Sequence, residues 1–350
     1  MNIENLVRPN IKRLKPYRSA REEFDGKADI FLDANENSMG STVGQDLNRY
    51  PDPMHRNLKA ELSRHKNVSA NRIFVGNGSD EAIDLLIRAF CEPGQNTVML
   101  MPPTYGMYKV SADINATETV QIPLDQDFQP DVNAVCQYLA NHAEVKIIFL
   151  CSPNNPTANL MEDKRLEQLL NVFNGLLILD EAYIDFSDGT GWLNQLDQHP
   201  NLVILQTLSK AWGMAAVRLG MAFADPRIID ILYKIKPPYN VNGLTQHMAL
   251  QALQNRQIYV TMVETIRHQK NVLINALEPL KQVKRIFPSD ANFLLVRFAE
   301  HQQIYEQLMQ NGIIVRDRSK MPGCQSCLRI TVGTQEENNK LIQVLKEMES

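Results

Sequence analysis

Cysteine and long apolar runs are both scarce in this sequence of 350 residues. The five cysteines are too few, and odd in number, for a disulfide framework, which favours a reducing compartment such as the cytoplasm. No run approaches the roughly 18 apolar residues that a membrane-spanning helix needs. Charged side chains in the segment Met1–Arg8 also interrupt the apolar stretch that a signal peptide requires. We therefore expect a cytoplasmic protein that does not cross a membrane.

An excess of one charge and metal-binding motifs are missing as well. The 36 lysines and arginines stand against 40 aspartates and glutamates, a net charge of −4, without a block of like charge. This argues against a surface that binds nucleic acid or anionic membranes. Cys324 and Cys327 have the spacing of a zinc or redox motif, but no second Cys/His pair lies nearby. We therefore expect no metal site.

What the sequence does contain is a regular alternation of apolar runs and amphipathic stretches. Several apolar runs are continuous, which is typical of parallel strands buried on both faces. In the stretch 82–90, apolar residues recur at spacings of three and four, as in a helix that covers such a sheet. The order predicts an α/β fold with βαβ units and a mostly parallel sheet. The expected strands are Arg72–Val75, Thr97–Met101, Glu118–Ile122, Val145–Cys151, Gly175–Leu179, Leu202–Gln206 and Leu219–Ala224.

A change of pattern at Pro237-Pro238 divides the chain, whose length suggests about two domains. After it we expect a long helix, two strands and a final helix, over residues 244–278, Phe293–Phe298, Cys327–Val332 and from about 336. The first 30 residues are polar and basic, and we expect them to form an arm that packs with the C-terminal domain. The predicted divisions are an N-terminal arm, a large domain and a small α+β domain, at 1–30, 31–240 and 241–350.

Three successive strands are expected to end in polar residues of different chemistry. In an open parallel sheet, ligands bind beyond the carboxyl ends of the strands, so these residues should share one rim. The rim would then hold an amide, a carboxylate, a phenol, two hydroxyls, an amine and a guanidinium. In chain order they are Asn155, Asp180, Tyr183, Thr207, Ser209, Lys210 and Arg218.

This set suits a cofactor that combines an aldehyde, a basic ring nitrogen and a phosphate, as pyridoxal phosphate does. A lysine amine forms a Schiff base with an aldehyde, and a carboxylate keeps the pyridine ring protonated as an electron acceptor. A further anion site is expected where the segment 76–81 opens a helix. Taken singly, Lys210 is equally compatible with a surface charge and Asp180 with a turn, so the combination carries the inference. The donors expected for the phosphate are Thr207, Ser209 and Arg218.

The motifs Asn155-Pro-Thr, Asp180-x-x-Tyr183 and Ser209-Lys210…Arg218-x-Gly220 resemble those of the class I/II aminotransferases, which are fold-type I enzymes dependent on pyridoxal phosphate. The resemblance covers nearly the whole chain and is greatest to the histidinol-phosphate aminotransferase family. It implies a seven-stranded, mostly parallel sheet sandwiched by helices, a smaller α+β domain and a homodimer. Further matching segments include Lys15-Pro-Tyr17, Asn35-Glu36-Asn, Arg49-Tyr50-Pro51, Pro102-Pro-Thr-Tyr105, Gly312-Ile-Ile-Val-Arg316 and Cys327-Leu-Arg329.

The resemblance also implies a role for each matching residue. Lys210 would form the Schiff base and transfer protons, Asp180 would pair with the ring nitrogen, and Tyr105 would stack on the ring. Asn155 and Tyr183 would hold its phenolate oxygen. The implied cofactor set is Ser79, Asp80, Tyr105, Asn155, Asp180, Tyr183, Thr207, Ser209, Lys210 and Arg218, with Tyr50 from the partner subunit. The implied substrate set is Tyr17, Asn35, Arg316 and Arg329.

The implied reaction converts L-histidinol phosphate and 2-oxoglutarate to imidazole acetol phosphate and L-glutamate, through pyridoxamine phosphate, in histidine biosynthesis. Because histidinol phosphate has no α-carboxylate, Arg329 would bind its phosphate first and the α-carboxylate of glutamate afterwards. An aromatic amino-acid aminotransferase or a threonine-phosphate decarboxylase on the same scaffold is the alternative. The chain departs from the family pattern at Ala158, where glycine is usual. Candidates for contact with the imidazole are Tyr17, Tyr108, Tyr239, Asn240 and Asn242.

Overall fold

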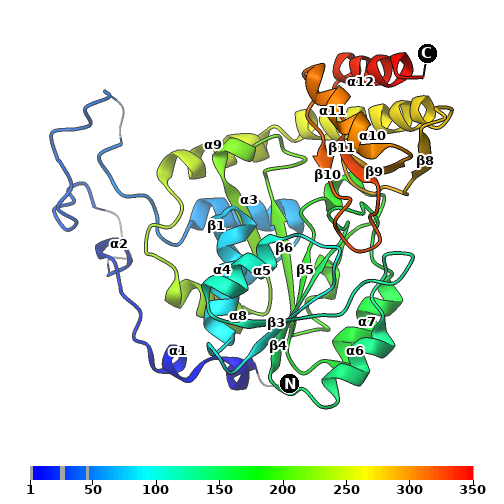
Figure 1. Cartoon of the computed structure of the whole chain (residues 1–350). Helices are drawn as coiled ribbons and strands as arrows, with labels where there is room; N and C mark the ends of the chain where they lie inside the picture. The colour runs from blue at the N-terminus through cyan, green and yellow to red at the C-terminus, as the bar shows by residue number, and fades with distance from the viewer. Residues whose placement is uncertain (1–2, 24–27, 45–46, 350) are drawn as a thin grey trace.

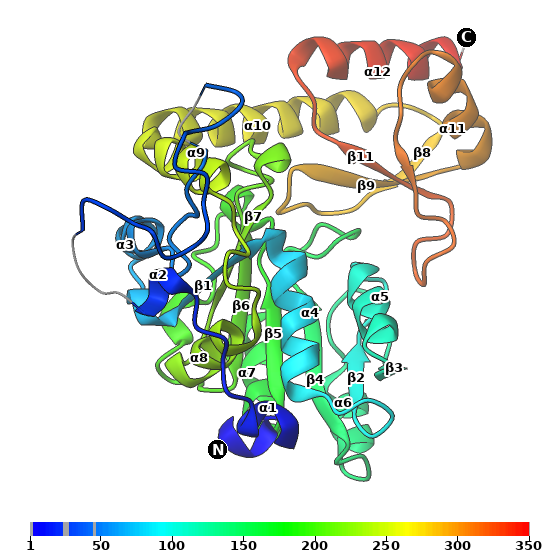
Figure 2. The same ribbon diagram turned by 90° about the vertical axis from the view of Figure 1, so that its left-hand side faces the viewer.

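The computed structural model describes residues 3–23, 28–44 and 47–349 of the chain. These residues form a large mixed sheet and a small antiparallel sheet, each with its own helices. The small sheet and its helices lie at the top of the molecule in Figures 1 and 2, above the rim of the large sheet.

The large sheet has seven strands within the described residues, in the order β1-β7-β6-β5-β4-β2-β3. Only β7 runs antiparallel to its neighbours, so the sheet is mostly parallel, as the sequence predicts. Its strands are β1 (Ile73–Asn77), β2 (Thr97–Leu100), β3 (Glu118–Gln121), β4 (Val145–Cys151), β5 (Leu176–Asp180), β6 (Leu202–Thr207) and β7 (Leu219–Phe223).

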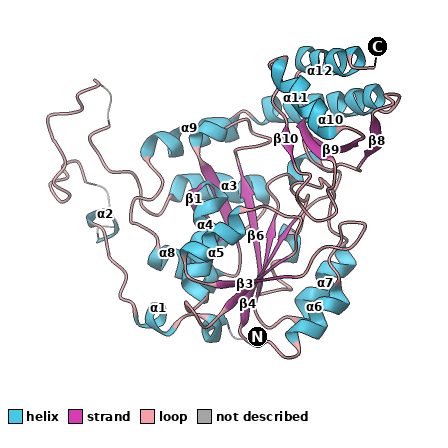
Figure 3. Ribbon diagram, in the orientation of Figure 1, coloured by secondary structure: helices cyan, strands magenta, loops and turns pink. Residues whose placement is uncertain are grey.

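Helices cover both faces of the large sheet (Figure 3). In β5, Leu176 and Ile178 pack toward one layer of helices, while Leu177 and Leu179 pack toward the other. Burial on both faces explains why the strands are continuous apolar runs. One layer contains α4 (Gly78–Phe90), α5 (Met107–Ile114) and α8 (Pro226–Ile235). The other contains α3 (Arg56–Lys66), α6 (Val132–Leu139), α7 (Asp163–Val172) and α9 (Gly243–Gln254).

The small sheet is antiparallel, with the strand order β10-β11-β9-β8 among the described residues. Helices pack on one of its faces, and the other face contributes Phe293, Leu295 and Cys327 to the core of the large sheet. Its strands are β8 (Val283–Ile286), β9 (Phe293–Phe298), β10 (Arg316–Asp317) and β11 (Cys327–Thr331). The helices are α10 (Arg256–Leu277), α11 (His301–Gln310) and α12 (Gln335–Glu347).

The helix expected over residues 244–278 is in fact two helices, because α9 ends at Gln254 and α10 begins at Arg256. Ala249 and Leu253 of α9 pack with the large sheet, whereas Leu273 and Leu277 of α10 pack with the small one. The change of packing therefore falls within α10, beyond the boundary expected at residue 240.

The described part of the N-terminal arm packs against one face of the large sheet. From the sequence, we expected it to pack with the small domain. Its described helices are α1 (Pro9–Arg13) and α2 (Ala20–Glu23). Ile3, Val7 and Ile11 are buried against the layer that contains α4 and α8. Arg8 forms an ion pair with Glu92 at 3.2 Å, just after α4. These apolar side chains determine where the arm lies. The expectation from the sequence rested on the basic residues of the arm, which do not indicate its packing position.

Among the described residues, no helix is both long and apolar enough to cross a membrane.

Candidate active site

The carboxyl ends of β4, β5 and β6 surround a cavity of about 110 Å³. All the residues of this chain that were predicted to contact the cofactor line it together, although they come from six separate segments. The lining residues are Gly78, Ser79, Asp80, Tyr105, Cys151, Asn155, Asp180, Ala182, Tyr183, Thr207, Ser209, Lys210 and Arg218.

Asp180, the last residue of β5, is a buried carboxylate whose hydrogen-bond donors among the described residues are neutral. The Tyr108 hydroxyl donates to its Oδ2 at 2.7 Å, and the Ala182 N–H donates to its Oδ1 at 3.1 Å. Burial raises the pKa of Asp180 to about 6, although both hydrogen bonds oppose the shift. A carboxylate in this setting gains from a cationic partner placed in the cavity.

The opposite side of the cavity is built to bind an anion. Arg218 Nη1 lies 3.5 Å from the Ser209 hydroxyl, which in turn accepts a hydrogen bond from Thr207 at 2.9 Å. The N-terminus of α4 has no side-chain cap, and the Gly78 N–H donates to the Arg218 carbonyl at 2.9 Å. The N–H groups of Ser79 and Asp80, which follow in the first turn of the helix, are therefore the ones suited to an anion. A Cβ on Gly220 would lie 2.1 Å from the Ser79 nitrogen, so only glycine lets β7 approach this turn so closely.

Lys210 lines the same cavity and is influenced by the charges of both Asp180 and Arg218. Its Nζ lies 5.5 Å from the centre of the Tyr183 ring. The surrounding protein, together with the charges of Arg329 and Arg218, lowers the pKa of the Lys210 amine. A lowered pKa increases the neutral fraction of the amine, which is the form that acts as a nucleophile or a base.

Asn155 and Tyr183 meet beside the lysine and connect the cavity to the small domain. The Asn155 amide donates to the Tyr183 hydroxyl at 3.4 Å. Arg329 of β11 donates from Nη1 to the Asn155 oxygen. Burial raises the pKa of the Tyr183 hydroxyl, which therefore remains a neutral donor. The small domain thus contributes a guanidinium at the edge of the cavity.

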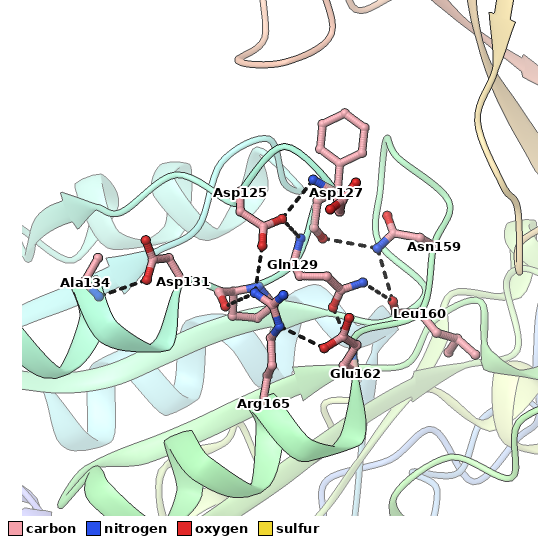
Figure 4. Close-up of polar contacts among 11 residues, drawn as sticks. Asp125, Asp127, Gln129, Asp131, Ala134, Asn159, Leu160, Glu162 and Arg165 are labelled. Atoms are coloured by element: carbon pink, nitrogen blue, oxygen red, sulfur yellow. Dashed lines mark hydrogen bonds and ion pairs between the residues drawn. The ribbon is translucent and has the colours of Figure 1, made fainter.

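The loop that carries Asn155 is fixed by a polar network behind it (Figure 4). Asn159 donates to the Phe128 carbonyl at 3.1 Å, and Gln129 donates to the Leu160 carbonyl at 2.9 Å. Ala158, which replaces the usual glycine, is buried and keeps a positive φ of 69°. The alanine therefore retains the left-handed turn, at the steric cost of its Cβ in that conformation.

These features fit pyridoxal 5′-phosphate. The buried Asp180 matches a protonated ring nitrogen, and the donors around Arg218 match a phosphate at the other end. Asp80 adds one negative charge near the phosphate side, but its carboxylate lies 3.6 Å from Arg218 Nη2 and accepts from the Tyr105 hydroxyl at 3.2 Å. Lys210 lines the same cavity and would supply the amine for the aldehyde group.

The predicted substrate residues are more dispersed. Tyr17 is 76% exposed and lies outside the cavity. Asn35 and Tyr50 line a second cavity with α9, and Tyr50 stacks on Tyr239 at 4.4 Å between ring centroids. Arg316 is exposed on β10, directly across from Arg329 on β11. One chain therefore assembles the predicted cofactor residues but leaves most of the predicted substrate residues on open surfaces.

Two residues of the cavity region were not predicted to serve the cofactor. Tyr108, considered only for the imidazole, is fully buried in α5 and bonds to Asp180. Its ring stacks on Phe149 at 4.6 Å, which fixes the direction of the hydroxyl. Cys151 ends β4 and lines the cavity. The contact of Tyr108 joins residues 72 positions apart, so no local pattern could indicate it.

Comparison with known proteins identifies the family. Residues 24–345 match the family model for aminotransferase class I and II. The chain is 52% identical to a histidinol-phosphate aminotransferase of Cytophaga hutchinsonii over 345 residues, which cover 99% of each chain. A histidinol-phosphate aminotransferase from Sinorhizobium meliloti, solved in complex with pyridoxal-5′-phosphate, has the same fold, with a TM-score of 0.79, 22% identity and 90% of each chain covered. An L-threonine-O-3-phosphate decarboxylase from Porphyromonas gingivalis also shares the fold, with a TM-score of 0.73 and 23% identity over 86% of this chain and 91% of that one. The chain therefore belongs to the class I and II aminotransferases, a family of pyridoxal 5′-phosphate-dependent enzymes.

Proposed function

We propose that this aminotransferase acts on L-histidinol phosphate and 2-oxoglutarate, giving imidazole acetol phosphate and L-glutamate in histidine biosynthesis. The observation that carries the proposal is the pairing of Arg316 and Arg329 across β10 and β11, next to Asn155 at the cavity. This pair suits an anionic substrate group close to the reacting amine. The 52% identity to a histidinol-phosphate aminotransferase supports it over the full chain.

When bound, pyridoxal phosphate supplies an aldehyde that condenses with amines and a ring that accepts electrons. Ser209, Arg218 and the N-terminus of α4 would hold its phosphate, and the Asp180 carboxylate would keep its ring nitrogen protonated. Asn155 and Tyr183 would donate to its phenolate oxygen. These assignments rest on the positions of the donors around the cavity.

Lys210 is the residue that moves the proton. With its pKa lowered, the neutral Nζ would remove the proton from the substrate carbon that bears the amino group. Arg329 would hold the anionic group of the substrate and so orient that carbon toward Nζ. In the second half-reaction the same guanidinium would bind the α-carboxylate of glutamate, because its bidentate donors suit carboxylate and phosphate alike.

Product analysis tests this proposal. Purified enzyme supplied with histidinol phosphate and 2-oxoglutarate should form glutamate and imidazole acetol phosphate in equal amounts. The decarboxylase alternative predicts release of carbon dioxide from threonine phosphate without any need for 2-oxoglutarate. An aromatic amino-acid aminotransferase would instead turn over phenylalanine faster than histidinol phosphate. Either of these results would contradict the proposal.

We also propose that the enzyme is a homodimer in which Tyr50 reaches the cofactor phosphate of the neighbouring subunit. Tyr50 is 51% exposed, and the Glu36 carboxylate fixes its backbone by accepting its N–H at 2.6 Å. Leu47 and Leu244, which line the same cavity as Tyr50, are open to solvent. Exposed apolar side chains also occur in the preceding segment and on α9: Ile30, Leu32, Met39, Val43 and Met248. Burial of such a surface favours association.

We also propose that the protein is located in the cytoplasm, because its cysteines are free thiols.

Mixing two impaired variants tests the shared site. A subunit with Tyr50→Ala and a subunit with Lys210→Ala should regain activity when they are unfolded together and refolded as a mixture. The mixed dimer would contain one site with an intact Lys210 and an intact Tyr50 from the neighbour. Activity no higher than that of the separate variants would contradict this arrangement.

A further inference from the structure

An arginine outside the predicted substrate set shares a face of the small sheet with Arg316 and Arg329. Arg316 is paired with Arg329 across β10 and β11. The N–H of Arg318 donates to the Cys327 carbonyl at 3.0 Å, so the same antiparallel register continues beyond β10. Because residues two apart on a strand point to the same face, Arg318 lies on the same face as the other two arginines, diagonally across from Arg329.

This face of the small sheet is the one turned toward the large domain. Cys327 and Leu295, which lies across from Arg329 on β9, belong to the core of the large sheet. Leu328 and Ile330, the two sequence neighbours of Arg329, pack instead in the small-domain core. Since Arg329 also reaches Asn155, this group of three arginines adjoins the cavity through Arg329.

Arg318 lacks the partners that a guanidinium normally finds. Its Nε is buried and has no hydrogen-bond partner in the described part of the chain. Asp317 belongs to the opposite face of β10, and its carboxylate accepts the Ser319 N–H at 2.7 Å. Burial lowers the pKa of Arg318, as do the charges of Arg329 and Arg316, while Asp317 opposes this effect. An anion placed among the three guanidiniums would relieve their repulsion.

We propose that Arg318 is a third guanidinium for the phosphate of the amine substrate, and that it makes this site favour phosphate over carboxylate. The proposal rests on the proposed function. A phosphate has up to two charges and three terminal oxygens, whereas a carboxylate has one charge and two oxygens. In histidinol phosphate, a CH₂–O link also places the phosphate farther from the amine-bearing carbon than the α-carboxylate of glutamate. The phosphate can therefore reach past the position of a carboxylate at Arg329, toward Arg318.

The test uses the full-length holoenzyme and compares Arg318→Gln with Arg285→Gln. Arg285 is a matched control because it belongs to β8 of the same sheet and lies over the Phe287 ring at 4.4 Å. Single-turnover half-reactions are followed with three amines separately: L-histidinol phosphate, L-histidinol and L-glutamate. L-Histidinol reports the binding of the same carbon skeleton without its phosphate.

Arg318→Gln should raise the half-saturating concentration of histidinol phosphate by at least about tenfold, and those of histidinol and glutamate by less than about threefold. Arg318→Lys should recover part of the loss, because it keeps the charge without the planar fork. The control variant Arg285→Gln should change none of the three half-saturating concentrations by more than about twofold.

Three results would overturn the proposal. They are an unchanged value for histidinol phosphate, an equal change for all three amines, and a loss confined to glutamate. A wild-type enzyme that does not react with histidinol phosphate would instead contradict the proposed function, so the two failures are distinguishable. As a readout independent of turnover, inorganic phosphate should raise the Tm of the wild-type holoenzyme more than that of Arg318→Gln.

Discussion

The cofactor cavity and the region proposed to bind substrate differ in how completely one chain builds them. Around the cavity, Asp180, Asn155 and Ser209 are held by hydrogen bonds to other protein groups. In the substrate region, Arg316 is exposed, Arg318 has an unpartnered Nε, and Tyr17 is open to solvent. The difference indicates that the fold of one chain prepares the cofactor site and leaves the substrate region open, as we expect if substrate and the proposed second subunit complete it.

Replacement of Lys210, in the cofactor cavity, should cause the largest loss of activity. Lys210→Ala should lower the rate of transamination by at least about 10⁴-fold, because both the nucleophilic amine and the base are removed. The visible absorbance of the lysine-linked cofactor should disappear as well. The rate is measured from glutamate formation with histidinol phosphate and 2-oxoglutarate. Substantial residual transamination would contradict the role of Lys210.

Asp180→Asn should lower the rate by about 10²- to 10³-fold, because a neutral amide cannot keep a ring nitrogen protonated. It should also stabilise the cofactor-free protein. The pKa of Asp180 is raised to about 6 from 3.8, so burial of its charge opposes folding above pH 6 and costs nothing below about pH 4.

The apoprotein of this variant should therefore exceed the wild type by about 3 kcal/mol in free energy of unfolding at pH 8, and the gap should close as the pH falls from 6 to 4. Urea unfolding at several pH values measures it. A variant that is less stable at pH 8 would show that Asp180 is satisfied without a cofactor.

A change in the proposed substrate region should lower the rate less, and it should slow both half-reactions. Arg329→Lys should weaken each by about 10- to 100-fold, because lysine keeps the charge but loses the bidentate geometry. Single-turnover measurements with histidinol phosphate and with glutamate give the two values. If only one half-reaction changes, the idea that one arginine serves both anions is wrong.

Tyr108→Phe should have the smallest effect. It should lower the affinity for the cofactor by about three- to tenfold, since it removes one hydrogen bond to a charged group. Because this bond lowers the pKa of Asp180, its loss should move the acidic limb of cofactor binding to higher pH. Cofactor affinity measured across pH 5–8 is the readout. Tyr305→Phe, on α11 of the small domain, is the control and should leave the profile unchanged.

The contrast between locally encoded elements and elements that depend on tertiary contacts also explains how far the structure could be predicted from the sequence. β4 and β9 are predicted with both boundaries, because each is a largely apolar run with polar or charged residues close to both ends. β8 and β10 were missed, since they are short, partly exposed and defined by pairing with β9 and β11. Arg318 was missed as well, because only the register of β10 and β11 places it beside Arg329.

In the site, the residues at strand ends were predicted because a parallel sheet brings its carboxyl ends together. The hydrogen bond from Tyr108 to Asp180 depends instead on how α5 packs beside α4 and places the Tyr108 ring on Phe149 of β4. The position of the arm depends on three apolar side chains in a segment with many charges. Such contacts follow from tertiary packing and have no local sequence signal.

The most direct test of the central claim is a single-turnover comparison of amines with the wild-type holoenzyme. The loss of cofactor absorbance is followed after mixing with histidinol phosphate, phenylalanine or aspartate. We expect histidinol phosphate to react with the highest ratio of rate to half-saturating concentration, by at least about tenfold, because its phosphate meets the arginines of the small sheet. Equal reaction with all three amines, or a preference for phenylalanine or aspartate, would contradict the account.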